Sequence, residues 1–113
     1  MTDSSERVDE ALGLVCNLPS EGRTGRTIAV QVLLRLAVER RESERGVVLV
    51  FAVSEDSSKA VLEFVLAERQ CCERLSYGIR FEPGTETFSL AIEAPTGNLV
   101  APLKALYAET GQE

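Results

Sequence analysis

Residues 76–93 read Ser-Tyr-Gly-Ile-Arg-Phe-Glu-Pro-Gly-Thr-Glu-Thr-Phe-Ser-Leu-Ala-Ile-Glu, and this stretch decides the fold. Large apolar residues take every second position on both sides of a central turn: Tyr77, Ile79 and Phe81, then Phe88, Leu90 and Ile92. Such alternation is typical of strands with one buried face, and Pro83-Gly84 between the two runs is typical of a turn. The stretch therefore predicts an antiparallel hairpin of strands 76–82 and 87–93.

A second pair of strands is predicted upstream, in a region that allows two interpretations. Residues 47–53 read Val-Val-Leu-Val-Phe-Ala-Val, a short β-branched run that predicts a buried strand. Before this run, apolar residues follow helical spacing over 28–36 and strand alternation over 34–38. We favour a helix over about 20–33 and a hairpin of 34–41 with 47–53. The alternative is one helix that continues to Arg41.

The segment between the two hairpins has the pattern of an amphipathic helix that ends near Cys72. Ser54 or Ser57 can cap its start, and acidic residues follow at once. Helical spacing places five residues on one face: Val61, Phe64, Val65, Glu68 and Cys72. The solvent-exposed side of the helix is predicted to carry Lys59, Glu63 and Gln70. Two further leucines, Leu62 and Leu66, widen the apolar stripe, so we expect the helix to be well covered.

A last helix is predicted over 99–108, with Pro102 in its first turn. The whole order is then helix, hairpin, helix, hairpin, helix. This order predicts an α+β fold, an antiparallel sheet of two hairpins with helices packed on one face. Residues 1–10 are expected to be a flexible acidic tail, and residues 11–113 a single domain. The second sheet face is expected to be partly open, and a homodimer would form through it if it is apolar.

Composition excludes several classes of function. The chain has 113 residues, of which 44% are hydrophobic, enough for one core. Its net charge of −6 argues against sequence-independent binding of nucleic acid. The absence of His removes Ser-His and Cys-His catalysis. The locally basic stretch 21–45 is expected to be a solvated face.

The chain is expected to reside in the cytoplasm. Its N-terminal residues are acidic, whereas a signal peptide needs a basic start and a longer apolar run. No apolar stretch reaches the roughly 18 to 20 residues that a membrane-spanning helix requires. In the cytoplasm thiols stay reduced, so the cysteines are free for metal or redox chemistry.

The three cysteines carry the functional prediction. Cys71 and Cys72 are adjacent, and Cys16 is distant in sequence. Thiolate sulfur selects soft ions, so three thiols suit Hg(II), As(III), Cu(I), or Zn(II) with a fourth ligand. Glu68, one helical turn before the pair, is the candidate fourth ligand for Zn(II) or an acceptor beside the site. Both thiols of the pair converge on one ion only if the helix ends or unwinds there, because adjacent helical residues point about 100° apart.

The sequence leaves two alternatives open. In one, the cysteines are ordinary core residues of a non-catalytic homodimeric interaction module whose protein partner is unknown, since free Cys is among the most buried residue types. In the other, the chain is a thiol redox protein, although Cys-x-x-Cys would be the stronger redox pattern. No residue is assigned a catalytic role.

The cysteine segments resemble those of a group of small uncharacterised bacterial proteins. These proteins share a Cys-x-Leu element followed by Glu-Arg-x-Cys-Cys, which corresponds here to Cys16-Asn17-Leu18 and Glu68-Arg69-Gln70-Cys71-Cys72. The order of hairpin, Cys-Cys helix and hairpin is similar too, so the resemblance covers roughly residues 16–107. Some members are encoded beside heavy-metal resistance genes, and the resemblance therefore implies metal binding.

The resemblance has two departures. The Gly-rich stretch 20–27 is unlike the helix-forming segment expected there, and the sequence after the cysteine pair differs. The group usually continues Cys-Cys-Pro-Phe, whereas this chain continues with Glu73-Arg74. A proline would break the helix and separate the two thiols, so that part of the geometry is not carried over. The resulting hypothesis is a small cytoplasmic protein that binds a thiophilic metal or metalloid for sequestration, delivery or sensing, without catalysis.

Overall fold

The computed structural model describes residues 20–71, 74–95 and 97–108. In these ranges the elements follow one another as α2 (Ser20–Leu36), β1 (Glu39–Glu42), β2 (Gly46–Ala52), α3 (Glu55–Cys71), β3 (Ser76–Phe81), β4 (Thr87–Glu93), a 3-10 turn η1 (Gly97–Leu99) and α4 (Val100–Leu106). The predicted order of helix, hairpin, helix, hairpin, helix is confirmed, and the fold is α+β. The predicted tail, residues 1–10, lies outside the described residues.

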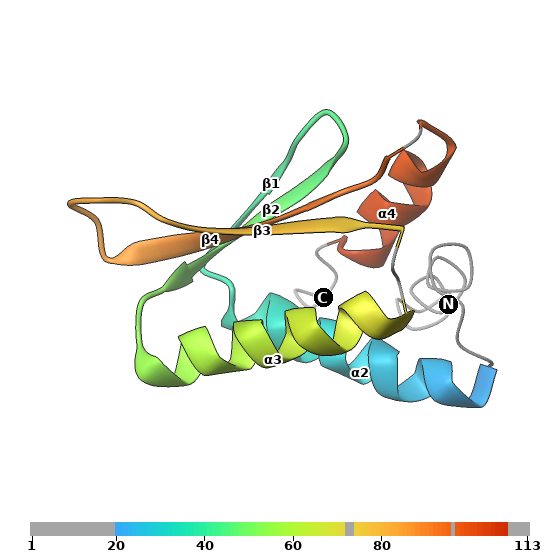
Figure 1. Cartoon of the computed structure of the whole chain (residues 1–113), viewed down its shortest axis with the longest axis horizontal. Coiled ribbons are helices and arrows are strands. Elements are labelled where there is room, and N and C mark those ends of the chain that lie inside the picture. The colour runs from blue at the N-terminus through green and yellow to red at the C-terminus, as the bar shows by residue number, and fades with distance from the viewer. Residues whose placement is uncertain (1–19, 72–73, 96, 109–113) are drawn as a thin grey trace, which may run out of the picture.

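The four strands form one antiparallel sheet in the order β1-β2-β4-β3 (Figure 1). The two hairpins are joined through β2 and β4, whose pairing runs from Gly46 opposite Glu93 to Ala52 opposite Thr87. Strands β2 and β3 are therefore parallel to one another, with β4 between them. Within the described ranges β1 and β3 are the two edges of the sheet.

One face of the sheet carries the core and packs against the helices, as Figure 1 shows. Side chains that face the helices alternate along the central strands with side chains that face away. On the helix-covered face, the buried set of β2 and β4 is Val47, Leu49, Phe51, Phe88, Leu90 and Ile92, and Val50 is buried on the other face. Val30 and Leu33 of α2 and Leu103 of α4 join the same cluster. All three helices therefore contribute to one apolar core, and its burial is the main source of stability.

Helix α3 begins where the sequence predicts. The backbone N–H of Ser57 donates to Oγ of Ser54 at 3.0 Å, and Glu55 and Asp56 lie in the first turn, where the helix dipole favours acidic side chains. The predicted face is confirmed for its described members: Val61, Phe64, Val65 and Glu68 are buried, and Lys59, Glu63 and Gln70 are exposed. Its fifth member, Cys72, lies outside the described residues.

The prediction that α3 is well covered was wrong at its leucines. Leu62 is 49% exposed and Leu66 is 52% exposed. The sheet covers one face of α3, and α2 lies along one flank, where Ala60, Phe64 and Ala67 line a groove between the two helices. By helical periodicity the leucines lie on the opposite flank, which no helix in the described ranges covers.

The predicted strand 34–41 was wrong at its start. Helix α2 continues to Leu36, and β1 begins only at Glu39. Val30 and Leu33 are fully packed in the core, so the helical spacing decides the structure up to the end of that turn. The chain changes from helix to strand pairing at Val38, because the N–H of Val38 donates to the carbonyl oxygen of Val50 in β2 at 2.7 Å. The hairpin of β1 with β2 is confirmed.

The last predicted helix, 99–108, is present as η1 followed by the shorter α4. Pro102 is the third residue of α4, so its missing N–H falls in the first turn, where no helical partner exists. Tyr107, which follows α4, is fully buried and meets Phe64 of α3 edge to face, with ring centroids 6.4 Å apart. This contact fixes α4 against the helical layer.

The second face of the sheet is open but mixed in character. Residues on this face include Val48 and Ala91, which are partly exposed, together with charged side chains near both edges. Arg41 and Glu39 form an exposed ion pair there at 2.8 Å, and Arg80 pairs with Glu82 at 2.5 Å. This face is therefore not a continuous apolar surface.

Candidate functional site

Glu68 is the single charged side chain that is fully buried in the described ranges. It lies on the sheet-facing side of α3, in line with Val61 and Val65, one turn from the end of the helix. Charged residues are almost never fully buried unless they are paired or bind an ion, because a carboxylate loses its hydration in an apolar interior. Glu68 is therefore a buried ionisable group of α3, three residues before Cys71.

The structure places the predicted site residues unevenly. Glu68 and Cys71 belong to the same helix, three residues apart, and Cys71 is its last residue. The side chain of Cys71, and the whole of Cys16 and Cys72, lie outside what the structure describes. Convergence of the three thiols thus stays a prediction, while the place of Glu68 on the same face of α3 as Val61 and Val65 is confirmed. Among the described side chains, no three His, Cys, Asp or Glu residues form a group that could hold a metal ion.

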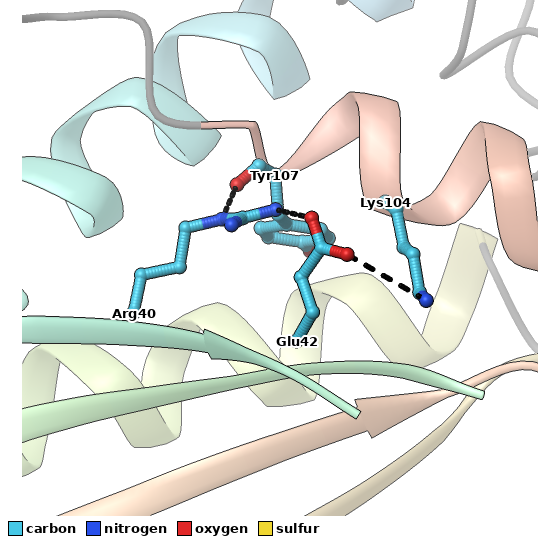
Figure 2. Close-up of polar contacts among 4 residues, drawn as sticks. All are labelled: Arg40, Glu42, Lys104 and Tyr107. Atoms are coloured by element: carbon cyan, nitrogen blue, oxygen red, sulfur yellow. Dashed lines mark hydrogen bonds and ion pairs between the residues drawn. The ribbon is translucent and has the colours of Figure 1, made fainter. Parts of the chain in front are cut away.

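A polar cluster links strand β1 to helix α4 (Figure 2). Arg40 donates from Nε to the carbonyl oxygen of Tyr107 at 2.5 Å and from a terminal nitrogen to Glu42 at 3.2 Å. The other carboxylate oxygen of Glu42 lies 3.6 Å from Nζ of Lys104. We call these four residues the β1–α4 clamp. Because its polar groups are directed at one another, the clamp has a holding role and presents no vacant donor set to a ligand.

The expectation that the basic stretch 21–45 is a solvated face was wrong at Arg40, whereas Arg45 is exposed and makes its hydrogen bonds at the surface. The side chain of Arg40 is 14% exposed and enters the clamp. Arg45 donates from Nε to the carbonyl oxygen of Ala94 at 3.0 Å and from a terminal nitrogen to Pro95 at 2.9 Å. Arg40 faces the core side because it lies opposite Leu49, and strand alternation at this register is the signal that could have revealed it.

A shallow groove of about 340 Å³ lies between α2 and α3. Its lining is apolar except for one carboxylate and consists of Ala29, Val32, Leu33, Leu36, Ala60, Glu63, Phe64 and Ala67. No Cys, Ser or Lys lines it, so the groove offers apolar contact and no nucleophile. A groove of this kind can receive apolar side chains of a bound molecule.

Comparison with known proteins gives this chain no relative. No protein-family model, no curated protein and no solved structure matches it. Within the described residues, none of the helices has both the length and the apolar character that crossing a membrane requires. The candidate site consequently rests on this chain's own residues.

Proposed function

We propose that this chain is a cytoplasmic protein that binds one thiophilic metal or metalloid ion through Cys16, Cys71 and Cys72. Glu68 would complete the coordination of Zn(II), or would accept a hydrogen bond beside a three-coordinate soft ion such as Hg(II), As(III) or Cu(I). The role would be to hold, deliver or sense the ion. No reaction is assigned to the site, because no general base or nucleophile is positioned in the described residues for one.

The observation that supports the proposal is that α3 ends at Cys71, the first residue of the cysteine pair, with a buried carboxylate, Glu68, three residues before it. Glu68 has no solvent exposure, although Glu63, on the same helix, is exposed. Glu68 and Cys71 are three positions apart on one helix, so the carboxylate of Glu68 lies within one helical turn of Cys71 and can serve the same ion as the thiols.

The direct test is a thiol titration of the reduced, metal-free full chain, with and without one equivalent of Hg(II), arsenite, Cu(I) or Zn(II), followed by native mass spectrometry. We expect one ion per chain and simultaneous protection of all three thiols. Binding should also raise the melting temperature, because a ligand that binds only the folded state stabilises it. Full affinity in the triple variant of Cys16→Ser, Cys71→Ser and Cys72→Ser would overturn the proposal, as would three thiols that react independently.

The carboxylate has its own matched pair of variants. Glu68→Gln keeps the shape of the side chain and removes its charge, and we expect it to weaken binding by about 10- to 100-fold. Glu63→Gln makes the same change on the exposed side of α3 and should leave the affinity unchanged. If both variants bound the ion with equal affinity, Glu68 would not belong to the site. The assignment of the three thiols would then depend on the titration alone.

A second candidate function is that of a homodimeric interaction module with structural cysteines. The observation that favours it is the number of large apolar side chains exposed on the helices and on β3: Ile28, Val32, Leu36, Leu62, Leu66, Ile79 and Phe81. This candidate predicts that Cys72→Ser lowers the free energy of unfolding equally with and without metal, because a buried hydroxyl replaces a thiol. Metal-dependent destabilisation by the same variant would speak against it.

A further inference from the structure

Strand β3 is an edge strand whose core-side row is left open. The register sets Ile79 opposite Leu90 and Phe81 opposite Phe88, so both side chains point toward the helix-covered face. Leu90 and Phe88 are buried there, yet Ile79 is 39% exposed and Phe81 is 58% exposed. Apolar side chains on the core face of an edge strand, next to unpaired backbone groups, form a template for another strand.

We infer that β3 is the surface through which two copies of this chain associate, by antiparallel pairing of β3 with β3 of a second copy. The result would be one continuous sheet of eight strands. This inference rests on the second candidate function, for which it supplies a surface, and is independent of the thiolate site.

Symmetry restricts the register of this pairing. Antiparallel strands of two identical chains are related by a two-fold axis perpendicular to the sheet, so one residue lies opposite its own copy and the helix-covered faces stay on the same side. A two-fold at Ile79 sets Tyr77 opposite Phe81 of the second copy and Phe81 opposite Tyr77. The exposed apolar row is then extended across the junction by aromatic pairs, which stabilise antiparallel sheets.

The outward-facing row supports the same register. With the two-fold at Ile79, Arg80 lies opposite Gly78 of the second copy, and no heavy atom lies within 4 Å of where a Cβ at Gly78 would be. The guanidinium therefore meets open space instead of a side chain. A two-fold at Arg80 would set two guanidinium groups against each other, and a two-fold at Gly78 would carry Phe81 past the end of the paired strand. Ile79 is the centre that avoids both faults.

Strand β3 is better suited to pairing with a second copy than β1, the other edge of the sheet. All four residues of β1 are charged, and Arg40 on its core-side row is held in the β1–α4 clamp. Strand β3 has six residues and a single charged one, Arg80, which is neutralised by Glu82. Only β3 thus combines length, apolar side chains and low net charge, the features that permit edge pairing.

The test measures association of the reduced, metal-free full chain by sedimentation velocity over a range of concentrations. We expect a monomer–dimer equilibrium. Ile79→Lys, which places two ammonium groups opposite each other at the axis, should raise the dimer dissociation constant at least about tenfold. The matched control is Val38→Lys beside β1, where the side chain is 62% exposed, and it should leave the constant unchanged. Circular dichroism of each variant confirms that it is folded.

Hydrogen exchange of the wild-type chain gives a second readout without substitution. The amides of residues 76–81 that point away from β4 should gain protection as the protein concentration rises, and those of residues 39–42 should not. A dimer unaffected by Ile79→Lys would overturn the β3 surface and leave the interaction module standing. A chain that stays monomeric at every concentration would overturn both the β3 surface and the homodimeric interaction module. The same conclusion would hold for a monomer whose β3 amides were protected at every concentration.

Discussion

The two edges of the sheet are built in opposite ways. Strand β1 is short and wholly charged, and its core-side arginine is covered by contacts to α4. Strand β3 is longer, almost free of charge, and exposes Ile79 and Phe81. Charge and brevity are the usual means by which proteins prevent unwanted pairing at an edge, and only β1 uses them. The difference teaches that one edge is closed to other strands and the other is available.

The largest effect should come from replacing Gly46 of β2, and the matched replacement is at Gly78 of the open edge strand β3. Gly46 joins the β1–β2 hairpin to β4, and a Cβ there would lie 1.8 Å from the carbonyl oxygen of Ile92. Because neither backbone can yield without breaking the pairing, Gly46→Ala should lower the free energy of unfolding by more than about 4 kcal/mol. Urea denaturation followed by circular dichroism measures it.

Gly78→Ala on β3 is the control for that experiment. A Cβ at Gly78 would meet nothing within 4 Å, and its backbone has no positive φ. We expect a change of less than about 1 kcal/mol, in the stabilising direction, because alanine restricts the unfolded chain. If both alanine variants lowered the free energy of unfolding by similar amounts, the contrast between the tight pairing of β2 with β4 and the open edge at β3 would be contradicted.

A smaller effect is expected along the aromatic row that leads to the open edge. Phe88 stacks on Phe51 with centroids 5.3 Å apart and on Phe81 with centroids 5.0 Å apart. Phe88→Ala should cost about 3–5 kcal/mol, since the ring is 1% exposed and its removal leaves a cavity.

At the end of the same row, Phe81→Ala should cost less than about 1 kcal/mol in the monomer, because the ring is already 58% exposed. The measurement is again the urea midpoint, taken at a concentration where the chain is monomeric. If Phe81→Ala were as damaging as Phe88→Ala, the row would not end in an open edge.

The last pair of variants lies on β1, where two neighbouring arginines face opposite sides, and includes the smallest effect expected. Arg40→Ala breaks the clamp and leaves the Tyr107 carbonyl without its donor, so a loss of about 1–3 kcal/mol is expected. Arg41→Ala removes an exposed ion pair to Glu39 and should change stability by no more than about 0.5 kcal/mol. Thermal melts of both variants test this prediction. A larger loss of stability for Arg41→Ala than for Arg40→Ala would contradict the holding role of the clamp.

Local pattern predicted the elements that depend on nearby residues. Strand 87–93 was predicted to the residue, because strand alternation and a Pro-Gly turn agree at that point. The boundary near Leu36 failed because apolar residues there satisfy both the helical and the strand period. The exposure of Leu62 and Leu66 also escaped prediction, since the cover on a helix flank depends on which neighbours the fold supplies.

The candidate site shows the same division. Glu68 could be assigned to the buried face of α3 from spacing alone, and its burial is confirmed. The role of Arg40 could not be foreseen from local pattern, because its hydrogen-bond partner Tyr107 lies 67 residues further along the chain. Contacts across such separations are set by the order in which strands join the sheet, and the hairpins alone do not determine that order.

The position of β4 has a consequence for how the protein is made. Strand β4 is the last strand to be synthesised, yet it lies between β2 and β3 and is the element that joins the two hairpins. A chain leaving the ribosome at about 5–20 residues per second therefore carries β2 and β3 with unpaired edges until residues 87–93 emerge. Long-range closure of this kind slows folding and prolongs exposure to other nascent chains. Chaperones that shield extended segments would act in that interval, before the sheet can close.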